Sequence, residues 1–188
     1  HKLSYFTRFN YSYKGKYLAQ GSIRRDAAGE ETLPRENRWG VFPSFSAGWV
    51  ISKERFFPEF FIDFLKIRAS WGLNGSLASL GTNYSYDNAL VSTMVYPINN
   101  NLFVNGTKPA RLYNPDLKWE TSEQVDVAVD LRAFSDRLTF TVDYYIKKTR
   151  DLLTSYTPPI ESGNDPSMIN AGDVLNRGFE FDLGFRHK

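Results

Sequence analysis

The chain has 188 residues, with 23 lysines and arginines against 21 aspartates and glutamates, and this near balance gives no general electrostatic case for a nucleic-acid partner. Hydrophobic residues make up 41% and charged residues 23%, so the chain is too apolar to be disordered. Cysteine is absent, which excludes a disulfide framework, a zinc ribbon, an iron–sulfur site and a cysteine nucleophile.

Apolar and polar side chains alternate along much of the chain, and this period of two predicts β-strands. We expect seven strands with almost no helix, over residues 3–13, 17–26, 39–51, 65–74, 119–132, 138–147 and 178–186. No apolar run approaches the roughly 18 residues that a transmembrane helix needs. The alternation begins at once, without a signal peptide, so we expect the natural protein to extend beyond this start.

The connections between these strands differ in length. Residues 14–16 and 134–137 form short turns, and a medium connector over 53–63 is expected to hold one helical turn around 57–62. A further short strand is expected near 89–96. Successive connections of an antiparallel meander lie on opposite edges of the sheet, so all the long loops are expected on one edge. These long loops cover residues 27–37, 75–116 and 151–173.

Two architectures produce alternating strands: a soluble β-sandwich, and a membrane β-barrel whose apolar face meets lipid. The one-sided long loops and the charged polar face favour the barrel, although the period alone leaves both open. Aromatic residues also gather at strand ends, as in interfacial girdles: Tyr11, Tyr13, Tyr17, Trp39, Trp49, Trp71 and Trp119. In a barrel, the charged positions predicted to line the lumen are Arg8, Arg24, Arg68, Asp126, Asp130, Asp143, Glu180 and Asp182.

No constellation in the sequence indicates catalysis, so we expect a protein that is not an enzyme and uses no cofactor. The two histidines, His1 and His187, lie at the chain ends, and no metalloprotease, nucleophile-elbow or phosphate-binding motif occurs. Glu180 and Asp182 share a strand face and could imitate a glycosidase pair, but this spacing is more typical of lumen-lining charge. Calcium-binding spacing is also missing around Asp87, so no metal site is predicted.

The long loops carry the candidates for binding a substrate. Tyrosine rings stack on sugar faces, and asparagine and aspartate form hydrogen bonds with hydroxyl groups. The opposing interpretation is that these side chains simply pack the loops together. The candidates are Tyr84, Tyr86, Asp87, Asn88, Tyr96, Asn99 and Tyr156.

Several motifs in one consistent order carry a family resemblance. Residues 114–124 read NPDLKWETSEQ, residues 143–153 read DYYIKKTRDLL, and residues 170–180 read NAGDVLNRGFE. Upstream, residues 38–49 read RWGVFPSFSAGW and residues 65–72 read LKIRASWG. Together they resemble the SusC/RagA-type TonB-linked outer-membrane transporters of Bacteroidota, over nearly the whole chain.

Some positions depart from that family pattern. Ala27 and Ala28 with Gly29 stand where a Gly-Ser turn is usual, Ser76 where asparagine is common, and Phe179 where an aliphatic residue is common. These positions lie in or near loops, so they leave the ligand open without contradicting the fold.

The resemblance implies part of a barrel of about 22 strands with a plugged lumen. Residues 1–188 would be a partial β-barrel domain, without the family's plug domain and barrel-closing strands. It implies import of glycans or peptides across the outer membrane, with a SusD-like surface lipoprotein and TonB, through the plug, as partners. The alternative from the residues alone is a soluble β-sandwich that binds carbohydrate.

Overall fold

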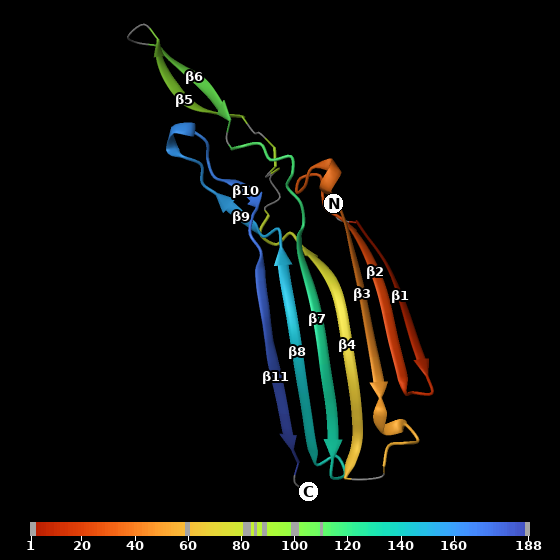
Figure 1. Cartoon of the computed structure of the whole chain (residues 1–188). Coiled ribbons are helices and arrows are strands. Elements are labelled where there is room, and N and C mark those ends of the chain that lie inside the picture. The colour runs from red at the N-terminus through yellow and green to blue at the C-terminus, as the bar shows by residue number, and fades with distance from the viewer. Residues whose placement is uncertain are drawn as a thin grey trace.

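The computed structural model describes residues 3–58, 61–80, 84, 86–87, 90–98, 102–109 and 111–186, with backbone only for 93–98 and 102–105. Seven strands form one antiparallel sheet, in which each strand pairs with the next (Figure 1). Their order is β1 (Leu3–Tyr13), β2 (Tyr17–Ala27), β3 (Trp39–Val50), β4 (Ile62–Ser76), β7 (Glu120–Ala133), β8 (Leu138–Arg150) and β11 (Val174–Phe185). The all-β antiparallel meander and its seven predicted strands are therefore confirmed.

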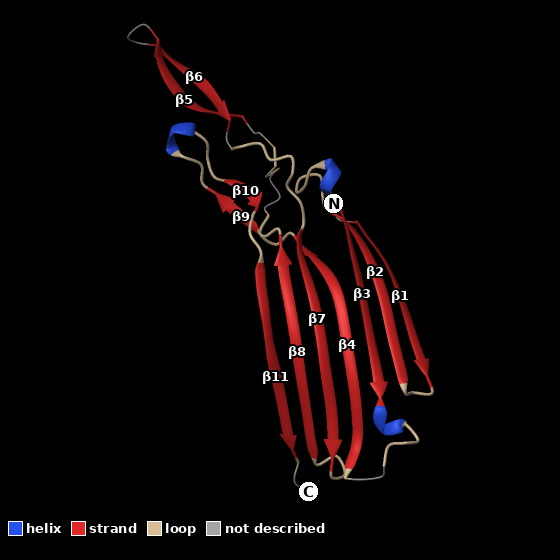
Figure 2. Cartoon of the chain, in the orientation of Figure 1, coloured by secondary structure: helices blue, strands red, loops and turns tan. Residues whose placement is uncertain are grey.

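The long loops all leave the same end of the sheet, as predicted, and two hairpins lie within them (Figure 2). The predicted short strand is β5 (Leu90–Ile98), and its partner β6 (Leu102–Pro109) was not predicted. Neither was the second hairpin, β9 (Leu153–Tyr156) with β10 (Ser167–Asn170). We call this end of the sheet the loop end and the opposite one the turn end.

Short 3₁₀ turns complete the secondary structure, at Arg35–Asn37, Ile51–Lys53 and Ile160–Ser162. The helical turn expected around 57–62 is wrong for the described residues there, because Phe57, Pro58 and Phe61 are not helical and β4 has begun at Ile62. Pro58 explains part of the difference, since a proline disfavours helical geometry in the residue before it. Residues 59 and 60 lie outside the described residues.

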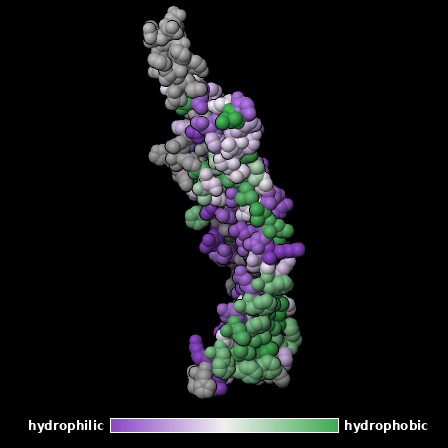
Figure 3. Space-filling view, turned by 90° about the vertical axis from the view of Figure 1, so that its left-hand side faces the viewer, coloured by the Kyte–Doolittle hydropathy of each residue, from purple (hydrophilic) through white to green (hydrophobic). Residues whose placement is uncertain are grey.

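The pairing register separates the side chains into two faces. Phe45, Trp71, Val125 and Ile146 oppose one another in a row across β3, β4, β7 and β8. This outward face is aromatic and aliphatic, and nothing in the described part of the chain covers it, so Phe181 remains 68% exposed. Viewed from the side of β11, hydrophobic residues gather over the lower part of the sheet and hydrophilic residues lie above them (Figure 3).

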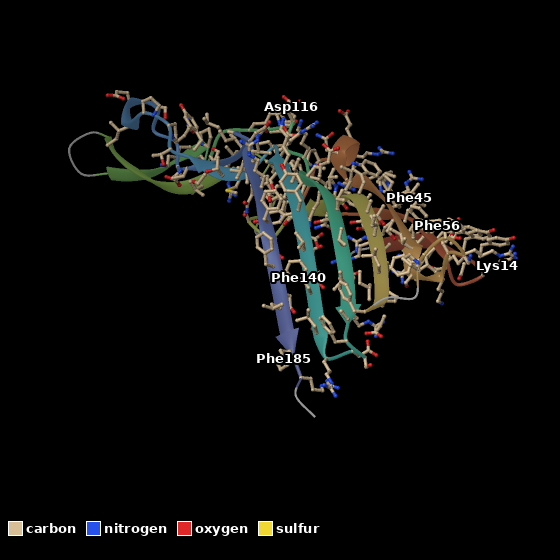
Figure 4. The ribbon with its side chains drawn as sticks, turned by 60° about the horizontal axis from the view of Figure 1, so that its bottom comes forward. Lys14, Phe45, Phe56, Asp116, Phe140 and Phe185 are labelled. Atoms are coloured by element: carbon tan, nitrogen blue, oxygen red, sulfur yellow. The ribbon has the colours of Figure 1, made fainter. Side chains whose placement is uncertain are left out.

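The apolar band of the outward face runs obliquely across the strands. At β1 to β3 it ends on the turn side with Tyr13, Tyr17 and Trp49, which lie in one row. On β11 that row falls at Phe181, and the band continues four residues further to Phe185 (Figure 4). The shift is about 13 Å over about 29 Å of sheet, a strand tilt of roughly 25°. Strands must tilt in this way for a sheet to curve into a barrel.

The turn end is closed by tight connections. Lys14 and Gly15 have positive φ angles of 52° and 62°, and the Lys16 N–H donates to the Tyr13 carbonyl at 2.9 Å. Two successive positive φ values define a type I′ turn, whose twist matches that of a β-hairpin. Figure 4 shows Lys14 at the tip of this β1–β2 hairpin.

Glu54 joins this hairpin to the segment that follows β3. Its carboxylate accepts hydrogen bonds from Lys16 Nζ at 2.9 Å, the Tyr17 hydroxyl at 2.8 Å and Trp49 Nε1 at 3.2 Å. These donors, with that of Lys16 first, lower the pKa of Glu54 from 4.5 to about 2. Glu54 therefore stays ionised and keeps all three contacts over most of the acid range.

We predict a pH-dependent loss when Glu54 is replaced. Because its folded pKa is depressed, Glu54 stabilises the fold fully above its ordinary value of 4.5, and this contribution disappears as pH falls through about 2. In the full-length protein that contains this segment, Glu54→Gln should lower the melting temperature at neutral pH. The gap from the wild type should close between pH 4.5 and 2.

The matched control is Glu161→Gln, which removes an exposed loop carboxylate that makes no ion pair among the described residues. It should leave the melting temperature unchanged at every pH. If the difference in melting temperature between Glu54→Gln and the wild type stays constant from neutral pH to pH 2, the charge of Glu54 does not contribute to stability.

Candidate functional site

The polar face of the sheet carries a dense set of charged side chains. Arg68, Asp143 and Glu180 lie in one cross-strand row over β4, β8 and β11, and Asp130 and Asp182 lie in the next. The register puts all eight residues predicted for a lumen on this one face: Arg8, Arg24, Arg68, Asp126, Asp130, Asp143, Glu180 and Asp182.

Arg68 is the centre of a hydrogen-bonded network on this face. Its Nη2 donates to both carboxylate oxygens of Asp143, at 2.7 and 2.9 Å, and its Nε donates to Asp130 at 3.3 Å. The Thr141 hydroxyl donates to the other oxygen of Asp130 at 3.3 Å. One guanidinium group therefore links three strands, because its donors are fixed in a fork that matches carboxylate oxygens.

Beside this network the polar face is hollowed and lined by both neutral and charged hydrogen-bonding groups. Asp126 accepts from the Ser70 hydroxyl at 3.0 Å and from Gln124 Nε2 at 2.9 Å. Two adjoining hollows of about 450 and 370 Å³ share Ser70 and Asp126, and together they extend from β1 to β8. Their polar lining includes Gln20, Ser44, Ser46, Asn74, Ser122, Gln124 and Lys147, none of which we had singled out in the sequence.

The other predicted polar-face residues stand apart from this network. Arg24 pairs with Asp26 at 2.7 Å near the loop end. Arg8, Glu180 and Asp182 make no ion pair among the residues that the structure describes. Arg68 thus shares its one positive charge between two carboxylates, whereas Glu180 and Asp182 on the edge strand β11 have no cationic partner among the described residues.

We predict that Arg68 and Asp143 are energetically coupled. Charge-assisted hydrogen bonds contribute about 1.5–3 kcal/mol, and partial exposure (40% and 23% of the side chains) reduces this. A double-mutant cycle with Arg68→Met and Asp143→Asn in the full-length protein should give a coupling energy of about 1–2 kcal/mol.

The matched control is the exposed pair of Arg132 and Asp136 at the β7–β8 turn, which lie 3.4 Å apart. A cycle on that pair should give below about 0.5 kcal/mol. Additive effects for Arg68→Met and Asp143→Asn would mean that the network contributes no more than separate surface charges.

At the loop end, segments from all three long loops pack around one small core. Leu33 and Leu117 are fully buried, and Ala28 and Leu153 join them. Polar side chains cross-link the same loops: Asn37 Nδ2 donates to the Leu117 carbonyl at 3.2 Å, and both Asn170 amide atoms bond the Lys118 backbone at 2.9 Å. The loops therefore form a packed layer over the end of the sheet.

Phe42 connects the sheet to this loop layer. Its ring is 7% exposed and meets the Trp119 ring edge-on, with 5.4 Å between centroids. Trp119 Nε1 in turn donates to the Arg38 carbonyl at 3.2 Å. A Cβ atom on Gly75 would overlap the Phe42 ring, so the absence of a side chain there makes room for this contact.

We predict that Gly75→Ala destabilises the protein by about 1–3 kcal/mol, because the added methyl group must displace a buried ring. Gly21→Ala is the control, since a Cβ atom there would have nothing within 4 Å. Melting curves of the two full-length variants should separate clearly. Equal melting temperatures would mean that Phe42 moves aside without cost.

The predicted loop residues divide between packing and exposure. The Tyr86 hydroxyl donates to the Glu30 carbonyl at 3.0 Å and its ring contacts the loop core, so Tyr86 contributes to packing. Tyr84 lies beside it, with 6.2 Å between ring centroids, and stays 48% exposed. Asp87 is exposed on the same segment, and Tyr156 is 43% exposed on β9, in a different loop.

Three predicted loop residues cannot be placed in the same way. Asn88 and Asn99 lie outside the described residues, and Tyr96 lies on β5, where only the backbone is described. The three therefore remain predictions.

Tyr86 also lines a cleft of about 540 Å³ between the β2–β3 loop and the segment before β7. Across the cleft, Arg38 Nη2 lies 3.4 Å from Glu30 Oε1. Arg35 makes no ion pair among the described residues, and Tyr113 is 60% exposed. The cleft is bordered by acidic, basic, aromatic and proline side chains: Glu30, Pro34, Arg35, Glu36, Arg38, Tyr86, Tyr113 and Pro115. Sequence reasoning missed all of these except Tyr86, because no local pattern brings residues 30–38 beside residues 86–115.

Comparisons with known proteins decide the family. A sequence profile described as TonB dependent receptor-like, beta-barrel matches residues 2–187. This chain belongs to that family. A TonB-dependent receptor of Formosa agariphila is 36% identical over 189 residues, covering 96% of this chain and 17% of the relative. The TonB-dependent receptor SusC of Bacteroides thetaiotaomicron is 32% identical over 186 residues, with shares of 96% and 18%.

A solved structure agrees with this membership. The RagAB peptide importer in its closed-closed state has a chain that superposes with a TM-score of 0.84 at 26% identity, covering 100% of this chain and 20% of that one. The resemblance to SusC/RagA-type receptors is therefore confirmed, as are the outer-membrane location and the expectation that the protein is not an enzyme. The chain spans about a fifth of the length of the relatives it matches.

Proposed function

We propose that this chain supplies part of the wall and surface loops of an importer for glycans or peptides in the outer membrane. The observation that carries the proposal is the two-faced sheet, apolar outward and hydrogen-bonding inward, below a packed loop layer. The relatives support it, since one is the RagAB peptide importer and another is the receptor SusC. TonB, acting through a plug, and a SusD-like lipoprotein that covers the loops would be the partners.

In this proposal residues 1–188 are one part of a β-barrel domain of about 22 strands. The outer edges of β1 and β11 have no neighbour in the sheet, and strand edges in lipid need partners for their backbone groups. The eight charged residues predicted for the lumen would line it, together with other polar side chains of this face. The Arg68 network would hold that wall rigid, and the serine, glutamine and asparagine side chains beside it would offer exchangeable hydrogen bonds to plug, water or substrate.

The loop layer would make the first contact with the substrate. Tyr84 and Tyr113 offer exposed rings, and Arg35 offers at the cleft a guanidinium group that makes no ion pair within the described part of the chain. Tyrosine and arginine suit both sugar faces and peptide groups, so this surface fits either substrate class. The residues predicted from the sequence, Tyr86, Asp87, Asn88, Tyr96, Asn99 and Tyr156, remain further candidates for substrate contact in this proposal.

The test is uptake by cells that express the full-length receptor with its partner lipoprotein. Fluorescent oligosaccharides and fluorescent oligopeptides are supplied separately, with and without a proton uncoupler. We expect one of the two classes to enter, and the uncoupler to abolish entry. Entry of neither class, or entry that the uncoupler leaves unchanged, would overturn the proposal.

The loop surface is tested in the same assay. Tyr84→Ala with Tyr113→Ala should reduce uptake roughly tenfold, since each lost ring contact is worth about 0.5–1.5 kcal/mol. Ile160→Ala is the control, because Ile160 is 90% exposed in another loop and does not line the cleft. An equal loss in both variants would show that these rings make no substrate contact.

A further inference from the structure

The outward face carries basic side chains where its apolar band ends on the loop side. Along β2 the outward positions reach Ile23 and then Arg25, and along β11 they reach Phe179 and then Arg177. On β8 the corresponding residue is Lys148. On β2, β8 and β11 a cation therefore lies on the loop side of the outward apolar run, with Leu175 beyond Arg177 on β11 and Glu123 at the level of Lys148 on β7.

These cations follow the slope of the band rather than one row of the sheet. Arg25 lies in the row of Tyr5 and Val41, whereas Arg177 lies four residues closer to the turn end. The turn-side border of the band descends by the same four residues between β1 and β11. The arginines therefore keep one level relative to the apolar band, which is the level of the lipid headgroups.

Arg25 is held without an acidic partner. Its guanidinium group lies 4.4 Å from the centroid of the Trp39 ring, and Trp39 in turn stacks on Tyr5. Arg24, the preceding residue, faces the other way and pairs with Asp26 at 2.7 Å. Of these two adjacent arginines, Arg24 on the polar face has an acidic partner, whereas Arg25 on the outward face makes no ion pair among the described residues.

The second position is similar. Arg177, on the edge strand β11, is exposed and makes no ion pair or hydrogen bond among the described side chains, and it lies next to the apolar Phe179 on the outward face. Lys148, beside it on β8, lies 3.6 Å from Asp173, a long contact between exposed groups. A guanidinium group at an apolar border needs an anion or water to compensate its charge.

We propose that Arg25 and Arg177 bind the phosphate groups of membrane lipids in the leaflet on the loop side. Arginine suits this ligand, because its planar fork donates two parallel hydrogen bonds to a phosphate group. Trp39 fixes the position of Arg25 through the cation–π contact and itself favours the interface. The barrel wall then anchors its own ring of anionic lipid, independently of any substrate in the lumen.

The experiment uses the full-length receptor in phosphatidylcholine vesicles that contain brominated phosphatidylglycerol. Quenching of tryptophan fluorescence reports the binding constant of the phosphatidylglycerol relative to phosphatidylcholine. For the wild type we expect a preference for phosphatidylglycerol that weakens as sodium chloride is added. Arg25→Gln and Arg177→Gln should each reduce this preference roughly fivefold.

Arg24→Gln is the matched control, since it removes the same charge from the opposite face of the same strand. It should leave the lipid preference unchanged, and Arg25→Lys should retain part of it. The proposal is overturned if a variant with both Arg25→Gln and Arg177→Gln keeps the wild-type lipid preference. It is also overturned if Arg24→Gln reduces the lipid preference as much as Arg25→Gln does. Should a glutamine variant fail to fold, the wild type still decides, because a preference insensitive to salt is also contrary to the proposal.

Discussion

Each inner strand of the seven-stranded sheet bonds its backbone to neighbours on both sides, and the register of that pairing determines where every side chain points. A slip of β4 by one residue would exchange its faces, moving Arg68 to the side of Phe45 and Val125. Because the backbone groups are satisfied within the sheet, one face can meet lipid while the other meets water. The oblique apolar band, the Arg68 network and the outward arginines all depend on this register.

The neighbouring residues Arg24 and Arg25 have different partners on the two faces of the sheet. On the polar face Arg24 pairs with a carboxylate, as Arg68 does. On the outward face Arg25 packs on an aromatic ring instead. Other outward cations do have acidic neighbours, since Arg150 lies 3.1 Å from Glu123 and Lys148 lies 3.6 Å from Asp173. In the proposed lipid site, the counter-charge of Arg25 comes from the membrane surface.

The loops do not behave as separate flexible connections. Leu33 and Leu117, 84 positions apart in sequence, are the fully buried side chains of their shared core. Phe42 and Trp119 continue this packing down to the sheet. Packing contacts therefore run continuously from the loop layer to the end of the sheet.

The sequence by itself determined the strands, their alternation and the side on which the long loops lie, because side-chain period and connection length are local properties. It also determined which charges share a face, since residues two apart on a strand point the same way. Motifs such as NPDLKWETSEQ carried the family resemblance that the comparisons confirmed.

Only the tertiary structure decided which of these groups meet. The pairing of β4 with β7 and β8 brings Arg68 to Asp130 and Asp143, and no local pattern encodes that register. Likewise Tyr86 became partly a packing residue, and Arg35 and Tyr113 came to border one cleft, because loops distant in sequence close on one another. Long-range contacts of this kind arise from packing three loops over one sheet end, which sequence periodicity does not report.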